Sequence, residues 1–590
     1  MNLSLKDAKL TTSLFFRLLP IQILLASLSY INNIVSSLFA TNYVGAEAMS
    51  AIGLYSPINM FLFAMGSMLV GGSMLLYGKY MGQNQPERTQ SIFNVDILSC
   101  IVLSGVTIFL LVFAAATGLT RTMTSDPLVL SQLNQYCLGI AIGILPMMLG
   151  QQLSAFLSLE NQSKRTSTAS IAFIIVNLIL HFVLVAKLRM GALGLALAAS
   201  IGQWVFLLIQ AQYFFSSKSS MKLGLKGMRM ADSIDIIKTG YPGALSHAYQ
   251  TIRGFIVNAL ILSYVGTGGL SAFSACNTFL TIFWSVPIGM VTVSRMLIGI
   301  SMGEEDRKTL TDVMRVMFLR CVPLQCLISA ALILLAVPLA KLYFHDPSDP
   351  IFQMTVDGFR ILPICMPLSI VCMHFVCYAQ ASGKQVLVHI LSLLDGVVCV
   401  AGYTALLIPF IGLNAIYHAN TLNGLTCIAA IIVYSCAVRK KFPHTLDELM
   451  VIPDDFGVPE KDRIDINVTK MEEVITVSRQ VSAFCREHKM DERRSYLGSL
   501  MLEEMAGNVV AHGFTKDKKD HSVDIRVTLK NDDMILRIKD DCIPFDPAER
   551  LAIINPDDPT RNLGIKLVFD CAKDIQHQNI LGLNVLTIRI

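Results

Sequence analysis

The sequence has little charge for its length. Only 15% of its residues are charged, whereas 53% are apolar and the mean hydropathy is +0.56. This balance excludes an ordinary soluble protein and indicates a chain that lies mostly in a lipid bilayer. The net charge of +4 gives no sign of a nucleic-acid partner, and we expect none.

Several familiar patterns are missing. The fourteen cysteines lack the paired spacing of a metal site, and many stand singly in apolar runs, which indicates reduced cysteines inside packed helices. The apolar stretch near the N-terminus has no small-residue cleavage site, so we expect its first helix to stay attached. No G-x-x-x-x-G-K-[ST] phosphate loop occurs, which excludes an ABC-type motor.

Long apolar runs fill the first 438 residues. A hydrocarbon core of about 30 Å needs about 20 apolar residues per helix, and twelve runs meet this length. Lys and Arg concentrate in the connections on the side of the N-terminus, which predicts both termini in the cytoplasm of a bacterial inner-membrane protein. The predicted spans are 14–40, 50–78, 91–116, 131–157, 166–187, 193–215, 236–263, 273–299, 314–342, 356–381, 385–408 and 412–437.

An internal repeat divides the membrane part into two halves. Short motifs of the first half recur 221 residues further on, and six helices per half indicate a parallel repeat, as in transporters with a substrate cavity between halves. We expect one lobe over residues 1–222, a second over 223–441 and a linker over 442–458. The repeated glycines are Gly45 and Gly266, Gly82 and Gly303, and Gly191 and Gly412.

The segment 33–90 resembles the opening of a multidrug and toxic compound extrusion (MATE) transporter. Gly45, Pro57, Gly71-Gly72 and Gly82 carry the resemblance, which extends over about residues 10–440. It implies an all-α polytopic membrane protein with twelve transmembrane helices in two six-helix lobes. Such a protein would export cationic or amphipathic compounds in exchange for protons or sodium.

Ionisable side chains inside apolar spans are costly and therefore mark candidate ion-coupling positions. Where MATE relatives often carry acids, this chain has Ser36 and His181, and His181 has a pKa suited to taking a proton in place of a carboxylate. Asp395 and Asp96 are the acids that remain as candidates. Other ionisable candidates are His247, Arg253, Arg295, His374 and His389. The transported substrate and the choice between H⁺ and Na⁺ stay open.

After Lys441 the composition changes to that of a soluble α+β domain, which we expect over residues 459–590. The helical pattern MLEEMAGNVVAHG places Glu504, Asn508 and His512 on one stripe. An Asn oxygen can ligate a Mg²⁺ ion that bridges nucleotide phosphates, and a carboxylate one turn earlier can deprotonate an attacking hydroxyl.

The loops 540–547 and 561–568 follow this helix in an order that resembles the anti-sigma-factor kinase branch of the histidine-kinase-like (GHKL) ATPases. The resemblance implies an α+β sandwich that binds ATP and Mg²⁺. By that resemblance Glu504 is the general base, Asn508 the Mg²⁺ ligand, Asp540 the acceptor for the adenine amino group, and Asn562 and Gly564 part of the phosphate loop.

Two positions depart from that pattern. Cys542 stands where a glycine is usual, and its Cβ would narrow the pocket under the base. Asn562 stands where a glycine-rich run is common, and Asn adopts positive φ less readily than Gly. Both departures are expected to lower the affinity of the domain for a nucleotide.

Alternative functions remain at this point. The chain could be an exporter driven by an ion gradient with a nucleotide-dependent regulatory tail. It could instead be a membrane-anchored sensor whose tail is a serine/threonine kinase acting on a cytoplasmic partner such as an anti-sigma antagonist. A flippase of lipid-linked saccharides is a lesser alternative.

Overall fold

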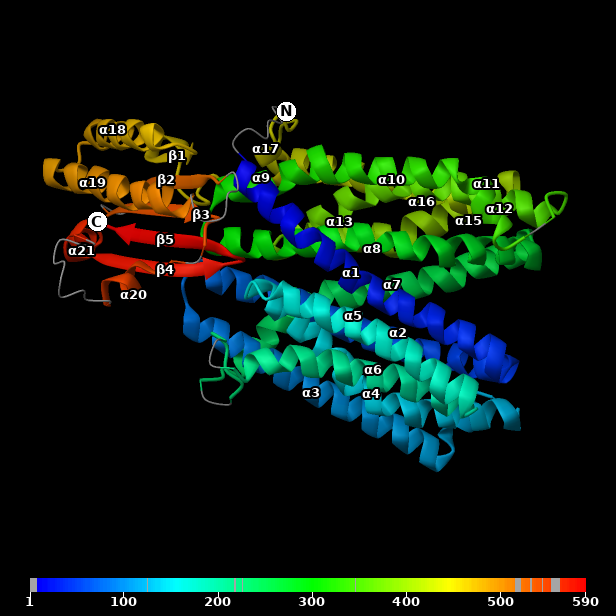
Figure 1. Cartoon of the computed structure of the whole chain (residues 1–590). Coiled ribbons are helices and arrows are strands. Elements are labelled where there is room, and N and C mark those ends of the chain that lie inside the picture. Colours follow the sequence, from blue (N-terminus) through cyan, green and yellow to red (C-terminus); the bar gives the residue numbers. More distant parts are fainter. Residues whose placement is uncertain are drawn as a thin grey trace.

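The computed structural model describes residues 8–124, 126–216, 219–224, 227–344, 346–514, 521–530, 533–543, 545–552 and 563–590. Two bundles of long helices run in roughly the same direction, and a smaller domain with a β-sheet covers one end of both (Figure 1). We call this end of the bundles the domain end.

The N-terminal lobe contains six spans, two of which continue into a π-helical turn. Its elements are α1 (Lys9–Phe39), η1 (Ala40–Val44), α2 (Ala46–Gly82), α3 (Pro86–Thr117), η2 (Leu119–Thr122), α4 (Pro127–Leu159), α5 (Ser163–Leu180), η3 (His181–Lys187) and α6 (Gly191–Phe214).

The C-terminal lobe repeats this order with more interruptions. Its elements are α7 (Ala231–Tyr264), α8 (Thr267–Gly303), α9 (Arg307–Val316), η4 (Met317–Cys321), α10 (Val322–Leu334), α11 (Ala336–Lys341), α12 (Pro350–Ile361), η5 (Leu362–Ile364), α13 (Cys365–Ala381), α14 (Gln385–Leu393), η6 (Leu394–Val398), α15 (Cys399–Ile411) and α16 (Asn414–Arg439).

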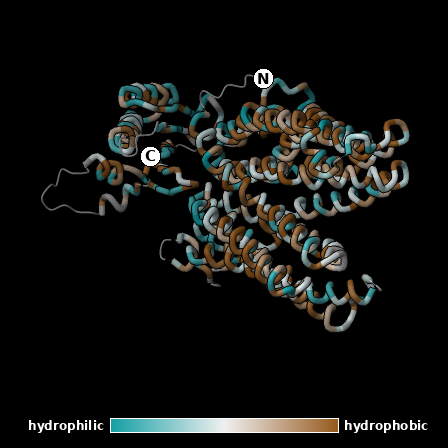
Figure 2. The backbone as a smooth tube through the Cα atoms, turned by 45° about the vertical axis from the view of Figure 1, so that its right-hand side comes forward, coloured by the Kyte–Doolittle hydropathy of each residue, from teal (hydrophilic) through white to brown (hydrophobic). Residues whose placement is uncertain are grey.

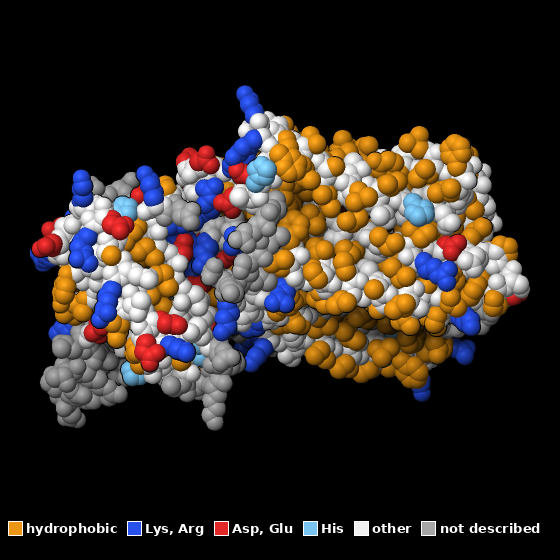
Figure 3. Space-filling view, turned by 90° about the horizontal axis from the view of Figure 1, so that it is seen from above, with side chains coloured by type: hydrophobic (Ala, Val, Ile, Leu, Met, Phe, Trp, Pro, Cys, Tyr) orange, Lys and Arg blue, Asp and Glu red, His pale blue; other side chains and the backbone are white. Residues whose placement is uncertain are grey.

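Within the described residues, eleven helical segments are long and apolar enough to cross a membrane. The remaining predicted span, α7, is a long helix in the bundle beside α2, although it contains Lys238, His247 and Arg253. The outward faces of the bundles are apolar, as the exposed Leu334 and Phe410 illustrate (Figures 2 and 3). The predicted polytopic fold with two lobes is confirmed.

The backbone repeats with the same shift as the sequence. Gly191, the first residue of α6, and Gly412, two residues before α16, have φ angles of 60° and 59°. Asn84 and Glu305, in the turns after α2 and α8, have φ angles of 53° and 52°. The two halves therefore have residues in the left-handed conformation at equivalent positions, where helices start or end.

Two equivalent helices also begin with the same Asp-Pro cap. Asp126 accepts a hydrogen bond from the Leu128 N–H (2.8 Å) at the start of α4, and Asp349 accepts one from the Ile351 N–H (2.8 Å) at the start of α12. A proline follows each aspartate at the first helical position, where its missing N–H costs nothing.

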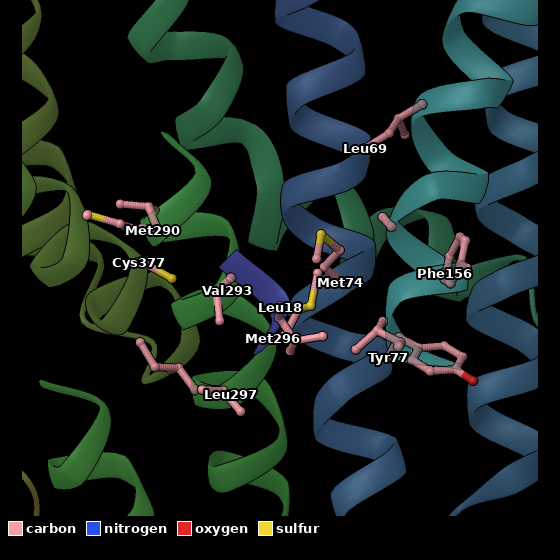
Figure 4. Close-up of a cluster of buried hydrophobic side chains, with 14 of the residues drawn as sticks. Leu18, Leu69, Met74, Tyr77, Phe156, Met290, Val293, Met296, Leu297 and Cys377 are labelled. Carbon is pink, nitrogen blue, oxygen red and sulfur yellow. The ribbon is translucent and has the colours of Figure 1, made fainter. Parts of the chain in front are cut away.

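The lobes approach each other closely where α2 crosses α8 near the domain end, and α2 packs as closely on α7 through Gly72 and Gly240. A Cβ on Gly303 would lie 1.9 Å from the Lys79 carbonyl oxygen, and one on Gly82 would lie 2.4 Å from the Ile300 carbonyl oxygen. Only glycine permits such contact between the two backbones. Side chains of both lobes, among them Leu18, Met74 and Met296, form one buried cluster next to this crossing (Figure 4).

The C-terminal domain contains an antiparallel sheet in the order β1-β2-β3-β5-β4. Its inner face is apolar and packs under α18 and α19, with Ile525, Val527, Leu536 and Ile538 buried. The predicted α+β domain is confirmed. Its elements are β1 (Arg463–Val468), α18 (Met471–Glu487), α19 (Glu492–Asn508), η8 (Val509–Gly513), β2 (Val523–Lys530), β3 (Asp533–Asp540), α20 (Pro547–Ala552), α21 (Leu563–Cys571), β4 (Asp574–Ile580) and β5 (Leu583–Arg589), preceded by α17 (Leu446–Met450) and η7 (Glu460–Asp462) in the connection.

Candidate functional site

A polar cluster lies inside the N-terminal lobe, between α1 and α5. The Ser36 hydroxyl oxygen is 3.1 Å from His181 Nε2, and His181 Nδ1 is 2.8 Å from the Asn177 carbonyl oxygen. Asn177 donates to Asn32 Oδ1 (2.9 Å), which extends the cluster along α1. His181 is fully buried, and its ring lies against Phe39. Ser36 and His181, which the sequence suggested as a pair of coupling candidates, are therefore direct neighbours.

A second polar cluster lies inside the C-terminal lobe. Asp395 Oδ1 accepts a hydrogen bond from Asn423 Nδ2 of α16 (2.7 Å). Arg253 of α7 donates to the Asp395 carbonyl oxygen (3.0 Å), which brings a positive charge to the same place. Intramembrane charges are usually functional, and here the carboxylate has an amide partner while the guanidinium binds the backbone carbonyl of the same residue.

His181 and Asp395 lie on corresponding spans but at different heights, since the shift of 221 residues places His181 opposite Gly402, seven residues beyond Asp395. Each lies on the fifth span of its lobe, at the start of a π turn: His181 opens η3, and Asp395 is the second residue of η6. A π turn inserts one extra residue into a helix and is common at functional sites. The sequence predicted both residues as candidates but not the turns that present them.

Asp96 is separate from both clusters. It lies on α3 and is fully buried, and among the described residues neither of its carboxylate oxygens has a hydrogen-bond partner. Ser73 of α2 lies beside it, but the Ser73 hydroxyl donates to the Val70 carbonyl oxygen (3.4 Å). Asp96 is thus a buried acid without a charged neighbour, and the structure does not bring it to His181 or Asp395.

Two groups of side chains have the chemistry to hold a soft metal ion. Cys372, Asp395 and Cys427 offer ligand atoms within 4.8 Å of one another, and so do His521, Asp541 and Cys542. Each group supplies three ligands, fewer than the four of a closed structural zinc site.

The predicted nucleotide residues gather at one side of the C-terminal domain. Glu504 and Asn508 lie one turn apart on α19, and Gly564 at the start of α21 packs against Glu504. A Cβ at Gly564 would lie 1.9 Å from Glu504 Oε2, so a larger residue here would displace the Glu504 carboxylate. His512 lies in the π turn η8 rather than in regular α-helix, and its side chain is exposed. Asn562 lies outside the described residues.

Asp540 ends β3 with a buried carboxylate. Its Oδ1 accepts hydrogen bonds from Asn584 Nδ2 (2.8 Å) and the Cys542 N–H (3.0 Å). Burial raises the pKa of Asp540 above 3.8, although these two hydrogen bonds act in the opposite direction. Cys542 itself packs on Gly513, where a Cβ would lie 2.8 Å from its sulfur, so the thiol occupies space that this glycine leaves open.

The residues present fit a nucleotide with its magnesium ion. Gly564 gives the close backbone approach that a phosphate needs, Asn508 offers an amide oxygen, and Asp540 offers a carboxylate that a hydrogen-bonded loop holds in place. A cavity of about 410 Å³ lies elsewhere, between the outer face of the sheet and the turns after α2 and α8.

Sequence reasoning missed the amides that complete these sites. Asn32, Asn177 and Asn423 are polar residues inside apolar spans, a signal that would have identified them as candidates. Asn584 lies in an ordinary strand pattern, and only the folded sheet brings it to Asp540.

Comparison with known families agrees with this architecture. The MatE family model matches residues 22–183 and 242–402, and the histidine kinase-like ATPase domain model matches residues 468–590. The first model thus matches more than half of the chain, once in each lobe.

Individual relatives are distant. A probable multidrug resistance protein NorM of Bacillus licheniformis is 21% identical over 304 residues, which cover 49% of this chain and 65% of the relative. One of Bacillus cereus is 21% identical over 238 residues and is covered to 52%, so the chain spans less than two thirds of either relative.

Solved structures share the fold of the membrane part. A crystal structure of MATE in complex with MaL6 has a TM-score of 0.67 at 18% identity, and it covers 73% of this chain and 97% of its own. The outward-facing conformation of a multidrug resistance MATE family transporter of the MOP superfamily has a TM-score of 0.66 at 20% identity, with the same coverage. The chain therefore belongs to the MatE family and carries a histidine kinase-like ATPase domain behind its membrane part.

Proposed function

We propose that this protein exports small cationic or amphipathic compounds across the bacterial inner membrane in exchange for an ion. The observation that carries the proposal is one ionisable group at the π turn of the fifth span of each lobe: His181, which is fully buried, and Asp395, which is partly buried. The names of the NorM relatives and the MATE structures support export as the class of activity.

The distribution of Lys and Arg supports one orientation of the chain in the membrane. The connections on the side of the N-terminus are rich in Lys and Arg, which supports placing the domain end and both termini in the cytoplasm. At that end the α2–α8 crossing is closed by Gly82 and Gly303. The lobes diverge away from it (Figure 1), as expected of a transporter that faces outward.

Proton or sodium coupling would involve the two polar clusters in different ways. Histidine is a common proton carrier, and the Nε2 of His181 faces the Ser36 hydroxyl, which suits this cluster to proton exchange. Asp395 offers a carboxylate beside the Asn423 amide, a pair of oxygen-bearing groups that could serve either ion.

The experiment uses everted membrane vesicles that contain the full chain. Uptake of a fluorescent cationic dye is measured while a pH gradient or a sodium gradient is imposed separately. Uptake that follows one of the gradients and collapses with it supports the proposal. Uptake that needs neither gradient, or none at all with folded protein present, contradicts it.

We further propose that the C-terminal domain binds Mg-ATP through Asn508, Asp540 and the start of α21, and that it regulates transport. When bound, the magnesium ion would neutralise phosphate charge, while Glu504 would hold or accept a proton near the terminal phosphate. The contact between Gly564 and Glu504 supports this arrangement, because it places the phosphate-loop backbone at the carboxylate.

A serine/threonine kinase is the second candidate activity for the same domain, since Glu504 is positioned as a general base. Incubation of the full chain in detergent with Mg-ATP and cytoplasmic extract would distinguish the two. Phosphate transfer to a protein that is lost in Glu504→Gln would favour the kinase. Nucleotide binding without transfer would favour the regulator.

A further inference from the structure

The outer face of the C-terminal sheet is charged and lies against the membrane part. On β2 and β3 the residues that alternate with the apolar core residues include the basic Arg526, Arg537 and Lys539 and the acidic Asp524. Arg526 and Arg537 are direct cross-strand partners, and like charges in such a pair repel each other unless acids lie between them. Within the sheet, Asp465 of β1 pairs with Arg526 Nε (2.5 Å), and Asp524 is the cross-strand partner of Lys539. The C-terminal lobe adds two further acids to the same basic residues.

The turn between α8 and α9 supplies the acids. Asp306 Oδ1 pairs with Arg526 Nη2 (2.6 Å), and Asp306 Oδ2 lies 3.4 Å from Lys539 Nζ. Glu304 pairs with Lys539 and lies 3.7 Å from Arg537 Nη1. The side chains of Glu304 and Asp306 are 3% and 4% exposed, so these pairs are buried at the contact.

Asp306 has two roles in this turn. Its carboxylate caps α9 by accepting from the Thr309 N–H (2.8 Å), and it also pairs with the sheet. Burial alone raises the pKa of Asp306, but the charges of Arg526 and Lys539 outweigh burial and hold the pKa well below 3.8. The carboxylate is therefore ionised at neutral pH, and a membrane helix start is tied to the sheet.

The same domain contacts the N-terminal lobe through the hairpin of β4 and β5. The Leu581 carbonyl at its tip accepts from Arg17 of α1, and Gly582 has φ +80° and lies against Asn161 in the turn after α4. Gln578 donates to Asn84 in the turn after α2. Leu581 is 1% exposed and belongs to the same buried apolar cluster as residues of α1 and α2.

One rigid sheet thus touches equivalent turns of both lobes. Asn84 and Glu304 belong to the turns after α2 and α8, which correspond in the repeat and flank the glycine crossing that closes this end. To face the cytoplasm, a transporter of this fold must separate α2 from α8 here. The sheet must release one of its two anchors first.

We propose that the C-terminal domain is a clamp between the lobes: anchored by Arg526 and Lys539 on one lobe and by the β4–β5 hairpin on the other, it restrains opening toward the cytoplasm. This inference rests on the proposed function only in that export requires such an opening. It assigns the domain a mechanical role that holds whether or not it transfers phosphate.

The test is hydrogen–deuterium exchange on full-length protein in lipid nanodiscs. The readouts are exchange at 75–83 and 297–305, where the lobes meet, and at 578–586, which reports docking of the hairpin. Glu304→Lys places a positive charge against Lys539 and Arg537, and Glu304→Lys with Lys539→Glu restores the pairing with the charges exchanged. Asp533→Lys, at the sheet end where Asp533 pairs with Lys573, is the matched control.

We expect Glu304→Lys to speed exchange at both lobe segments about tenfold or more, and the double variant to return it toward the wild-type rate. The control should match wild type. Leu581→Asp at the hairpin tip should give the same loosening from the other anchor.

Release of the hairpin in either variant with unchanged exchange at both lobe segments would overturn the clamp. Unchanged exchange at all three segments in both variants would also overturn the clamp, because it would mean that neither anchor restrains the separation of the lobes. The readout does not depend on transport. Absent dye export together with the expected exchange pattern would refute the proposed function and leave the clamp standing.

Discussion

At the scale of single residues, Asp395 is an acid of the membrane part that two neighbouring spans hold in place. Its carboxylate is held by Asn423 and its backbone by Arg253, so a change of its charge alters the cluster without leaving a cavity. We expect Asp395→Asn to abolish dye export while expression and monodispersity stay unchanged, because the amide keeps the shape and loses the charge. Transport assays in everted vesicles measure this. Asp346→Asn, at an exposed loop position, is the control, and wild-type export in Asp395→Asn would remove this residue from the coupling site.

The raised pKa of Asp540 leads to a prediction about how Mg-ATP affinity depends on pH. Because burial raises its pKa, the carboxylate takes up a proton at a higher pH than an ordinary aspartate, and the protonated form accepts a hydrogen bond from an adenine amino group less strongly. We expect affinity for Mg-ATP to fall as the pH is lowered through this raised pKa. Stability responds with the opposite sign, since a raised pKa stabilises the fold at acid pH and the stabilisation is lost as the pH rises. Calorimetric titration of the full chain between pH 5 and 8 tests this. Asp540→Asn should bind weakly at every pH, and a variant that kept the wild-type pH profile would show that another group is responsible.

At the scale of elements, the crossing of α2 and α8 depends on glycine. A Cβ at position 303 would overlap the Lys79 carbonyl oxygen, so we expect Gly303→Ala to destabilise the protein by about 1–3 kcal/mol and to lower the apparent melting temperature. Gly402→Ala on α15 is the matched control, since no described atom lies within 4 Å of a Cβ there and alanine favours helix by about 1 kcal/mol. Thermal aggregation in detergent compares the two. A melting temperature in Gly303→Ala at or above that of Gly402→Ala would mean that the helices separate easily at this point.

Some helices and strands could be predicted from the sequence, whereas the π turns and the contacts between distant segments could not. The length and composition of apolar runs predicted the spans, and α19 with β2 and β3 was evident from periodicity, because these signals are local. The π turns η3 and η6 were not predictable, since an extra residue in a helix leaves the apolar pattern almost unchanged. The pairing of Glu304 with Lys539 joins residues 235 positions apart, and nothing near either residue indicates the other.

At the scale of the whole molecule, the membrane part and the C-terminal domain share a buried interface. We expect residues 1–441 expressed alone to insert into the membrane and stay folded in detergent, because one large apolar cluster joins the two lobes and each lobe has smaller clusters of its own. We also expect a lower melting temperature than that of the full chain, since the fragment lacks the Leu581 contact and leaves Glu304 and Asp306 without their basic partners. Size-exclusion chromatography after heating measures both. Aggregation of the unheated fragment would contradict an independently folding bundle, and an equal melting temperature would contradict a stabilising interface.

The β4–β5 hairpin has a consequence for biosynthesis. Residues 574–589 follow every span in the chain, so the ribosome makes them after the helices have entered the membrane. Insertion of the bundle and the sealing of its end by Leu581 are therefore two events separated in time. A protease or chaperone that meets the nascent protein between these events meets a transporter whose domain end is still uncovered.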